Sequence, residues 1–205
     1  MDYKEFNHLI LLIGTNPLPN FVVADYFLQN NPNIQTIWLI HSEANKLQAG
    51  TDKQAKNLDS LLRKRWEGEP PKHPNLRFPL EKVSLSDVSD AASIRREIER
   101  KMLKRWNNSD TFHLNYTGGT KAMATHVYLR LQELQRSGQR PFSYLDANNF
   151  RLVLDGDVII ADDLRRKVRI EFEDLIALHD FARKNQDRPV DLADAEQMFK
   201  RFIEP

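Results

Sequence analysis

The chain contains no cysteine, which excludes disulfide bonds and thiolate-bound metals and is typical of a reducing compartment such as the cytoplasm. Its six histidines form no H-x-H or H-E-x-x-H pair, so a zinc site is not expected. The apolar run at residues 9–13 is far shorter than the ~20 residues that span a bilayer. Asp2, Lys4 and Glu5 interrupt the stretch where the apolar part of a signal peptide would begin. We therefore expect a cytoplasmic protein with no metal and no resident cofactor.

A strong charge of either sign is also missing. The 30 Lys and Arg residues nearly balance 29 Asp and Glu residues, which leaves a formal net charge of +1. Bulk electrostatics therefore gives no sign of a long nucleic acid as partner, and any small anion has to be held locally. The length of 205 residues suits one domain, which buries roughly 70% of the surface of its unfolded chain.

Apolar periodicity alternates between strands and helices along most of the chain. Residues 8–13 form a nearly continuous apolar run, typical of a central parallel strand covered on both faces. Further strands are predicted at residues 34–41, 111–116 and 142–145, and helices from residue 21 and over residues 46–66, 90–106 and 123–138. Residues 76–85 contain another predicted strand, whose early part Pro79 makes edge-like or irregular. Asp155-Gly156 between two apolar runs indicates a β-hairpin. This order predicts an α/β fold with a Rossmann-like, mostly parallel sheet flanked by helices and an antiparallel hairpin at one edge.

The pattern changes after residue 165. A short extended piece at residues 168–170 precedes two predicted helices, residues 172–179 and 192–202, which Asp187-Arg188-Pro189 separates. We divide the chain into a core domain, residues 1–165, and a short helical appendage, residues 166–205. The appendage could be a linker, a lobe that faces a second copy, or the beginning of another domain.

The most informative stretch is residues 111–123, T-F-H-L-N-Y-T-G-G-T-K-A-M, where an alternating strand breaks into a turn that opens a helix. Gly118 and Gly119 have no Cβ, so a phosphate can approach the backbone closely. The free N–H groups at a helix N-terminus carry about half a positive charge, which favours an anion. A Gly-Gly turn can also be a plain connection, and we give the two interpretations equal weight.

The side chains around this turn add to its anion-binding character. Lys121 supplies a mobile full charge, and the hydroxyls of Thr117 and Thr120 can donate to phosphate or ribose oxygens. The spacing does not match G-x-x-x-x-G-K-[ST], so a Mg-nucleotide hydrolase of that type is disfavoured.

A second loop, the uncharged G-T-N-P-L-P-N at residues 14–20, follows the first strand at the end where open α/β sheets bind ligands. Ser42 occupies the equivalent position after the second strand. Gly14 could merely turn the chain, and Asn16 and Ser42 could merely cap helices. If the first and fourth strands are neighbours, the two loops line one crevice whose neutral donors and single lysine suit ribose phosphates and adenine edges.

Together these loops resemble those of a CRISPR-associated Rossmann fold (CARF) domain, of the branch found in CARF-fused nucleases and related type III CRISPR effectors. The resemblance rests on the joint presence of G-x-N-P-x-P-N after the first strand and N-x-T-G-G-T-K-x-M after the fourth, and it spans roughly residues 1–162. The segment F-E-D-L-I-A-L-H-D at residues 172–180 also resembles the segment that comes directly after the sensor core in that branch.

The resemblance implies a homodimer that binds a cyclic oligoadenylate across its two-fold axis and relays the binding allosterically. Cyclic tetra-adenylate is the first expectation and cyclic hexa-adenylate the second, because a two-fold site suits a ring with an even number of identical units. The implied ligand-binding residues are Gly14, Thr15, Asn16, Pro17, Leu18, Pro19 and Asn20, which shape an adenine pocket, Ser42, which touches the ligand, and Asn115, Thr117, Gly118, Gly119, Thr120 and Lys121, of which the last five hold phosphate and ribose.

Two other functions stay open. Some members of the family cleave their own ligand without metal, and Lys121 with Thr120 or Thr117 could stabilise that transition state electrostatically. Only His113 is near enough to be considered as a general base, and its strand position favours a structural role. The other alternative is a ligand-responsive transcription regulator whose DNA-binding lobe begins near residue 170, against which the modest net charge and the absence of a clustered basic helix there argue.

Family members usually carry an effector domain such as a nuclease, and no second catalytic constellation is recognisable in this sequence. The chain could therefore be an excised sensor whose fused effector is absent, a stand-alone sensor, or a protein whose output is a conformational change in a partner or in a membrane segment absent from this chain.

Overall fold

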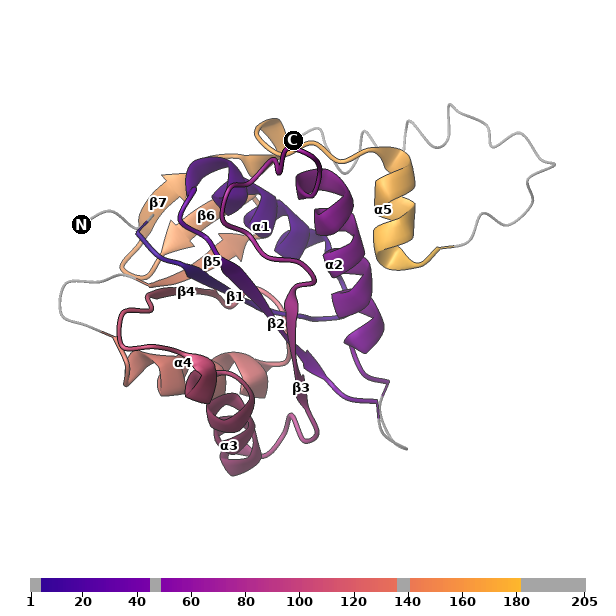
Figure 1. Ribbon diagram of the computed structural model, residues 1–205. Coiled ribbons are helices and arrows are strands. Elements are labelled where there is room, and N and C mark those ends of the chain that lie inside the picture. The colour runs from indigo at the N-terminus through magenta and orange to yellow at the C-terminus, as the bar shows by residue number, and fades with distance from the viewer. Residues whose placement is uncertain (1–4, 45–48, 136–140, 182–205) are drawn as a thin grey trace.

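In the part of the chain that the structure describes, seven strands form a single sheet in the order β3-β2-β1-β4-β5-β6-β7 (Figure 1). The protein is represented by a computed structural model, in which residues 5–44, 49–135 and 141–181 are described. The strands are β1 (His8–Leu12), β2 (Thr36–Ser42), β3 (Glu81–Leu85), β4 (Phe112–Asn115), β5 (Phe142–Asp146), β6 (Arg151–Leu154) and β7 (Val158–Ala161). Strands β1 to β5 pair in parallel, and β5, β6 and β7 pair antiparallel. The predicted fold class is confirmed: a mostly parallel Rossmann-like sheet with an antiparallel hairpin at one edge.

Helices cover both faces of the sheet. Helices α1 (Leu18–Asn30) and α2 (Asp52–Trp66) lie on one face, and α3 (Ala91–Lys101) and α4 (Lys121–Gln132) lie on the other (Figure 1). The described residues also contain helix α5 (Phe172–His179) and the 3-10 turns η1 (Leu103–Arg105) and η2 (Leu164–Arg166). None of the helices in the described ranges has both the length and the apolar character needed to cross a bilayer.

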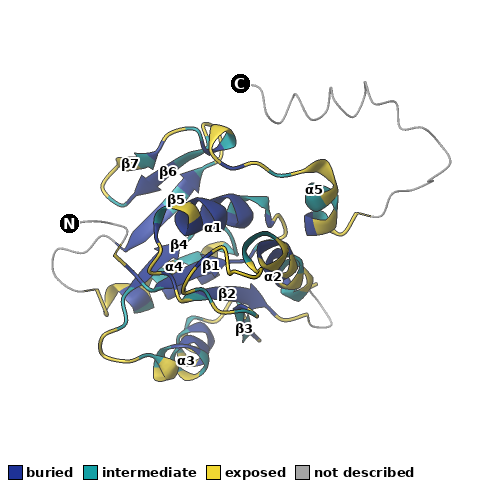
Figure 2. Cartoon of the chain, turned by 45° about the horizontal axis from the view of Figure 1, so that its top comes forward, coloured by how far each residue is buried: buried dark blue, intermediate teal, exposed yellow. Residues whose placement is uncertain are grey.

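The central strand β1 shows why the sheet sits inside the molecule. Leu9 and Leu11 pack with the α1–α2 layer, whereas Ile10 and Leu12 pack with the α3–α4 layer, and all four are fully buried. Because successive strand residues point to opposite faces, a run that is apolar at every position requires cover on both sides. Figure 2 shows the resulting distribution, with buried strands at the centre and exposed residues on the outer helix faces and loops.

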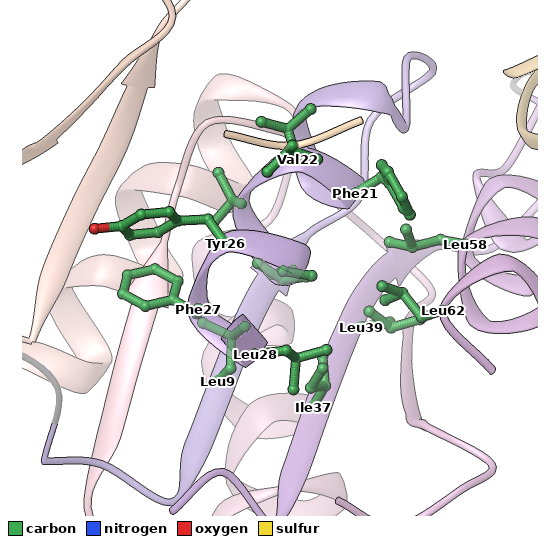
Figure 3. Packing of buried hydrophobic residues seen from close by; sticks show 14 of the residues in the cluster. Leu9, Phe21, Val22, Tyr26, Phe27, Leu28, Ile37, Leu39, Leu58 and Leu62 are labelled. Atoms are coloured by element: carbon green, nitrogen blue, oxygen red, sulfur yellow. The ribbon is translucent and has the colours of Figure 1, made fainter. Parts of the chain in front are cut away.

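The α1–α2 layer is a continuous apolar contact (Figure 3). Phe21 of α1 lies beside Leu58 of α2, and Leu62 of α2 lies beside Leu39 of β2. An ion pair joins the same two helices: Arg65 Nε lies 2.5 Å from Oδ1 of the fully buried Asp25, and Arg65 Nη2 donates a hydrogen bond to Asp25 Oδ2 at 2.9 Å.

Several predicted boundaries are corrected. The second helix begins at Asp52 instead of residue 46, and α4 ends at Gln132. The third strand lies within residues 76–85, as expected, and begins at Glu81. Pro79 keeps the early part of that stretch out of the strand, since a proline has no N–H to give to a sheet ladder. Residues 168–170, where we expected a short extended piece, belong to no helix or strand. Ser137-Gly138, which we expected to end α4, and the second C-terminal helix at residues 192–202 lie outside the described residues.

The C-terminal helix α5 packs against α2. Leu178 is buried in the same core as α1 and α2, and its carbonyl accepts a hydrogen bond from Asn57 Nδ2 at 3.3 Å. Lys64 of α2 and Asp174 of α5 form an ion pair at 2.5 Å. Val168, which follows η2, is also part of this core.

Candidate functional site

Strands β1 and β4 are direct neighbours, so the loops that follow them emerge side by side. The register places Leu11 opposite Asn115. On the β1 side of this pair the sheet extends to β2 and β3, and on the β4 side it extends to β5, β6 and β7. The junction of β1 and β4 is therefore the topological switch point of the sheet, the place where open α/β folds bind ligands.

The two loops are in close contact. A Cβ added to Gly14 would lie 3.1 Å from the backbone nitrogen of Gly119, and one added to Gly118 would lie 2.0 Å from Leu12 O. Gly119 has φ +76°, a left-handed conformation that glycine adopts without strain. The expectation that residues 14–20 and 117–121 meet at one edge of the sheet is confirmed, and the glycines are what allow the approach.

Helix α4 opens directly at this contact. Thr120 is its N-cap, and Thr120 Oγ1 accepts a hydrogen bond from the backbone N–H of Met123 at 3.1 Å. Lys121 occupies the first helical position and is exposed. The first N–H groups of a helix have no partner within the helix, so a ligand at this end could accept hydrogen bonds from them close to the exposed Lys121. The predicted helix N-terminus beside the Gly-Gly turn is confirmed.

The side chain of Asn115, the last residue of β4, is fully buried and forms hydrogen bonds that fix the turn before α4. Its Nδ2 donates to Ser143 Oγ at 3.0 Å, and its Oδ1 accepts from Thr117 Oγ1 at 2.7 Å and from Thr117 N at 3.3 Å. Thr117 Oγ1 in turn accepts from the N–H of Leu145 at 2.7 Å. The hydroxyl proton of Thr117 is thus already used inside the protein, which leaves Thr120 as the better donor to a ligand oxygen.

The loop after β1 is shorter than predicted, because α1 begins at Leu18, with Pro17 as its N-cap residue. Leu18, Pro19 and Asn20 therefore form the first turn of α1 and are not part of a free loop. Asn16 Oδ1 accepts a hydrogen bond from Leu18 N at 3.1 Å. The N-terminus of α1 consequently opens at the same edge as that of α4, which adds a second helix dipole of favourable sign.

Residues of the first loop differ in their access to solvent. Thr15 and Asn16 are exposed, whereas Pro17 is buried. Asn20 is fully buried and donates from Nδ2 to Leu12 O at 3.0 Å, beneath Gly118. Of the predicted adenine-pocket residues, Thr15 and Asn16 are open to a ligand, and Asn20 supports the end of β1.

Ser42 at the end of β2 is 4% exposed and faces Thr51, a residue that sequence reasoning missed. Ser42 N donates to Thr51 Oγ1 at 3.1 Å, and Thr51 Oγ1 donates to Ile13 O at 3.0 Å. Thr51, which precedes α2, thereby joins the ends of β1 and β2. The interpretation of Ser42 as a helix cap is wrong, since the N-cap of α2 is Thr51. A ligand would reach Ser42 only after displacing its neighbours.

His113 lies below the site and is almost completely buried. It stacks on Phe6 with 5.0 Å between ring centroids, and its Nε2 lies 2.8 Å from Ser143 Oγ. Burial lowers the pKa of His113 to about 3, so the imidazole is neutral at physiological pH. This histidine has a structural role and is not placed to act as a general base for a ligand at the loops. Nor do the described residues contain a group of three or more His, Asp or Glu side chains that could hold a metal ion.

No family model matches this chain, and no curated protein matches it. Among solved structures it is similar to protein VC1899 from Vibrio cholerae, with a TM-score of 0.58 and 12% identity over 83% of this chain and 38% of that one. Csm6 of Enterococcus italicus bound to cyclic hexa-2'-fluoro-hexa-dAMP gives a TM-score of 0.48 and 14% identity over 96% of this chain and 44% of that one. The chain thus spans less than half of either structure. The first likeness supports the α/β fold alone, and the second is too weak to add to it.

Proposed function

We propose that this chain is a sensor domain that binds a cyclic oligoadenylate, with cyclic tetra-adenylate the first candidate and cyclic hexa-adenylate the second. The observation that carries the proposal is the close approach of the two motif loops at the β1–β4 switch point, where a Cβ on Gly14 would lie 3.1 Å from the backbone nitrogen of Gly119. The two loops that carry the CARF resemblance are thereby parts of one site. On the basis of the same resemblance, we propose that the domain serves a type III CRISPR antiviral effector.

The chemistry of this edge suits a nucleotide ring. The positive dipole ends of α1 and α4 favour phosphate at this edge. At the start of α1 the N–H of Leu18 already donates to Asn16 and Pro19 has none, so N–H groups for a phosphate come from the first turn of α4. Lys121 adds a full charge, and the Thr120 hydroxyl can donate to a phosphate or ribose oxygen. The exposed Thr15 and Asn16 supply neutral polar groups of the kind that read the edge of an adenine.

We further propose that the domain acts as a homodimer. A ring with an even number of identical nucleotides can present the same half to each of two identical protomers, so both copies of the site bind it with the same residues. In this proposal residues 1–165 bind the ring, and the following segment, of which α5 packs on α2, leads to an effector outside this chain.

Neither alternative function gains an observation. Ring cleavage would need a general base, and His113 was the one residue considered for that role. Its imidazole is buried, and its lowered pKa leaves it neutral, so it is not placed to take a proton from the ligand. A DNA-binding lobe would begin near residue 170. In the part of the chain after that residue which the structure describes, the one helix is α5, which packs on α2 and pairs its Asp174 with Lys64, so it does not form a separate basic lobe.

The test is to incubate the purified chain with adenylate rings of three to six units and with the matching linear oligomers. At 100 times Kd, binding to the native state stabilises it by about 2.7 kcal/mol, which for a chain of this size is on the order of 5–10 °C in Tm. We expect one even-numbered ring to raise the Tm of the protein. Chromatography should recover that ring intact, and light scattering should show that the protein bound to it has twice the mass of one protomer. No shift with any ring would refute the proposal, and linear product formed by catalytic amounts of protein would favour the nuclease.

A further inference from the structure

We propose that Asp155 is a positioning residue for this site, which holds Tyr116 and Tyr128 and thereby fixes the turn that presents Thr120 and Lys121. This inference rests on the proposed function for its ligand and on the structure for its geometry. Asp155 follows β6 and is half-buried. Its Oδ1 accepts a hydrogen bond from the Tyr116 hydroxyl at 2.8 Å, and its Oδ2 accepts one from the Tyr128 hydroxyl at 2.5 Å.

The two tyrosines come from the two sides of the Gly118-Gly119 turn. Tyr116 stands immediately before Thr117, and its own N–H donates to Ser143 O at 3.0 Å. Tyr128 lies seven positions after Lys121, which is two helical turns further along α4 on nearly the same side. The rings of Tyr116 and Tyr128 meet edge to face, with centroids 5.6 Å apart at 89°. One carboxylate therefore ties the end of β4 to the helix that follows the turn.

The turn needs such a tie because of its glycines. Gly118 and Gly119 are required by the close approach of β1, but glycine has the largest conformational freedom of any residue. A binding loop that samples many conformations loses affinity, because the ligand has to order it. Fixing both ends of the turn on Asp155 removes much of that freedom before a ligand arrives, so the N–H groups of α4 are preorganised.

The charge on Asp155 makes these bonds stronger than bonds between neutral groups. Burial and then the hydrogen bond to Asp155 raise the pKa of Tyr128 to about 12, and the same causes raise the pKa of Tyr116 further. Both phenols consequently remain protonated donors over the whole physiological range. None of the ion pairs among the described residues involves Asp155, so the tyrosine hydroxyls are its described side-chain partners.

The hairpin that carries Asp155 does not depend on this carboxylate. The backbone N–H of Asp155 donates to Phe142 O at 3.2 Å, and four residue pairs hold β5 to β6 from Ser143–Leu154 to Asp146–Arg151. Loss of the carboxylate should leave this backbone pairing intact and act on the turn and on α4. That distinction allows positioning to be separated from general stability.

The experiment compares Asp155→Asn with Asp157→Asn, an exposed residue of the same hairpin turn, in the full chain. The first measurement needs no ligand: hydrogen–deuterium exchange of peptides that cover residues 116–124, read by mass spectrometry. We expect exchange about tenfold faster in Asp155→Asn than in wild type, with exchange in β1 unchanged, and no difference in Asp157→Asn. Equal exchange in wild type and Asp155→Asn would overturn the inference.

The second measurement is affinity for the ring that stabilises the wild type. We expect about tenfold weaker binding by Asp155→Asn, and partial losses in Tyr116→Phe and Tyr128→Phe, each of which removes one hydroxyl. Faster exchange with unchanged affinity would overturn the positioning role. If the wild type binds no ring, the proposed function fails while the exchange experiment still decides whether Asp155 fixes the turn. Should Asp155→Asn not fold, Tyr128→Phe provides both measurements.

Discussion

Gly118 lies directly against the carbonyl oxygen of Leu12, so close that a Cβ at this position would stand 2.0 Å from that oxygen. The relationship joins the loop after β4 to the last residue of β1, two segments that are far apart in the sequence but adjacent in the sheet. Because the neighbour is backbone, a side-chain rotation cannot relieve the overlap. The residue at position 118 therefore sets how closely the two loops of the site can lie.

Replacing Gly118 by alanine should destabilise the protein. We expect a loss of about 1–3 kcal/mol in the free energy of unfolding, the usual cost of forcing extra atoms into a packed region, measured by urea denaturation. Gly68→Ala is the matched control, because its Cβ would lie 3.6 Å from the nearest atom, Pro70 O, and should change stability by less than about 0.5 kcal/mol. Equal losses in the two variants would contradict the close contact at Gly118.

Lys121→Ala should weaken ring binding while leaving the fold intact. Lys121 is exposed, so its removal opens no cavity, but it deletes the full positive charge nearest to the N-terminus of α4. A hydrogen bond to a charged group contributes roughly 1.5–3 kcal/mol, which corresponds to at least about a tenfold loss of affinity. Titration calorimetry measures the affinity, and Tm should stay unchanged.

The control for this variant is Lys104→Ala. Lys104 is also exposed, but it lies in η1, before β4, whereas Lys121 follows that strand. Its removal should not alter ring affinity at moderate salt. A similar loss in both lysine variants would indicate a general electrostatic effect and would remove Lys121 from the site.

Much of the fold could be predicted from local patterns. The apolar run of β1 indicates a strand buried on both faces, and Leu9 and Ile10 indeed belong to opposite layers. The Gly-Gly turn is recognisable because the periodicity changes from two to 3.6 residues at that point. The pairing of β1 with β4 could only be assumed from the sequence, and topology rules made it reasonable because β1 and β4 then flank the switch point.

The features that could not be predicted depend on contacts between distant segments. Ser42 reads as a helix cap, and only the fold shows that Thr51 crosses from α2 to the ends of β1 and β2. Asp155 reads as a turn residue, since Asp-Gly is a strong hairpin signal, and nothing local connects it with Tyr116 or Tyr128. A buried hydrogen bond between residues far apart in the chain leaves no periodicity to detect.

Acidification should destabilise the protein in part through His113. Its native pKa of about 3 lies below the ordinary value of 6.5, so between these values the unfolded chain binds a proton that the native state does not. The stabilisation is fully present above about pH 6.5 and is lost as the pH falls toward 3. Between pH 7 and pH 5.5 this amounts to about 1 kcal/mol. Urea denaturation at several pH values measures it.

A variant of His113 can separate its contribution to the pH dependence of stability from the contributions of the other histidines. Burial also lowers the pKa of His8, His73 and His179, so the wild type responds in the same direction at several places. His113→Phe keeps a ring next to Phe6 but cannot titrate. Its unfolding free energy should depend less steeply on pH between 7 and 5.5, whatever its absolute stability. Parallel pH profiles for the two proteins would contradict the assignment.

Substitutions of Thr120 can separate the stability of α4 from ligand binding. Thr120 Oγ1 accepts the N–H of Met123, and a hydroxyl that accepts a hydrogen bond still has its own proton to donate to a ligand oxygen. Thr120→Ser retains both capacities and should behave like the wild type. Thr120→Ala loses both, and the lost cap should cost about 1 kcal/mol of stability.

Thr120→Asp is the decisive variant, because aspartate is as good an N-cap as threonine or better, and its negative charge is favourable at a helix N-terminus. The free energy of unfolding should therefore remain within about 0.5 kcal/mol of the wild type or rise. The same carboxylate would occupy the place proposed for a phosphate and repel it, so binding of the adenylate ring should fall by at least about a hundredfold, an estimate that combines a lost donor with like-charge repulsion. Stability is read by urea denaturation and binding by calorimetry on the same preparation. A Thr120→Asp protein that is stable and binds the ring as tightly as the wild type would show that the phosphates lie elsewhere, since no anion site at the start of α4 could tolerate a carboxylate at its centre.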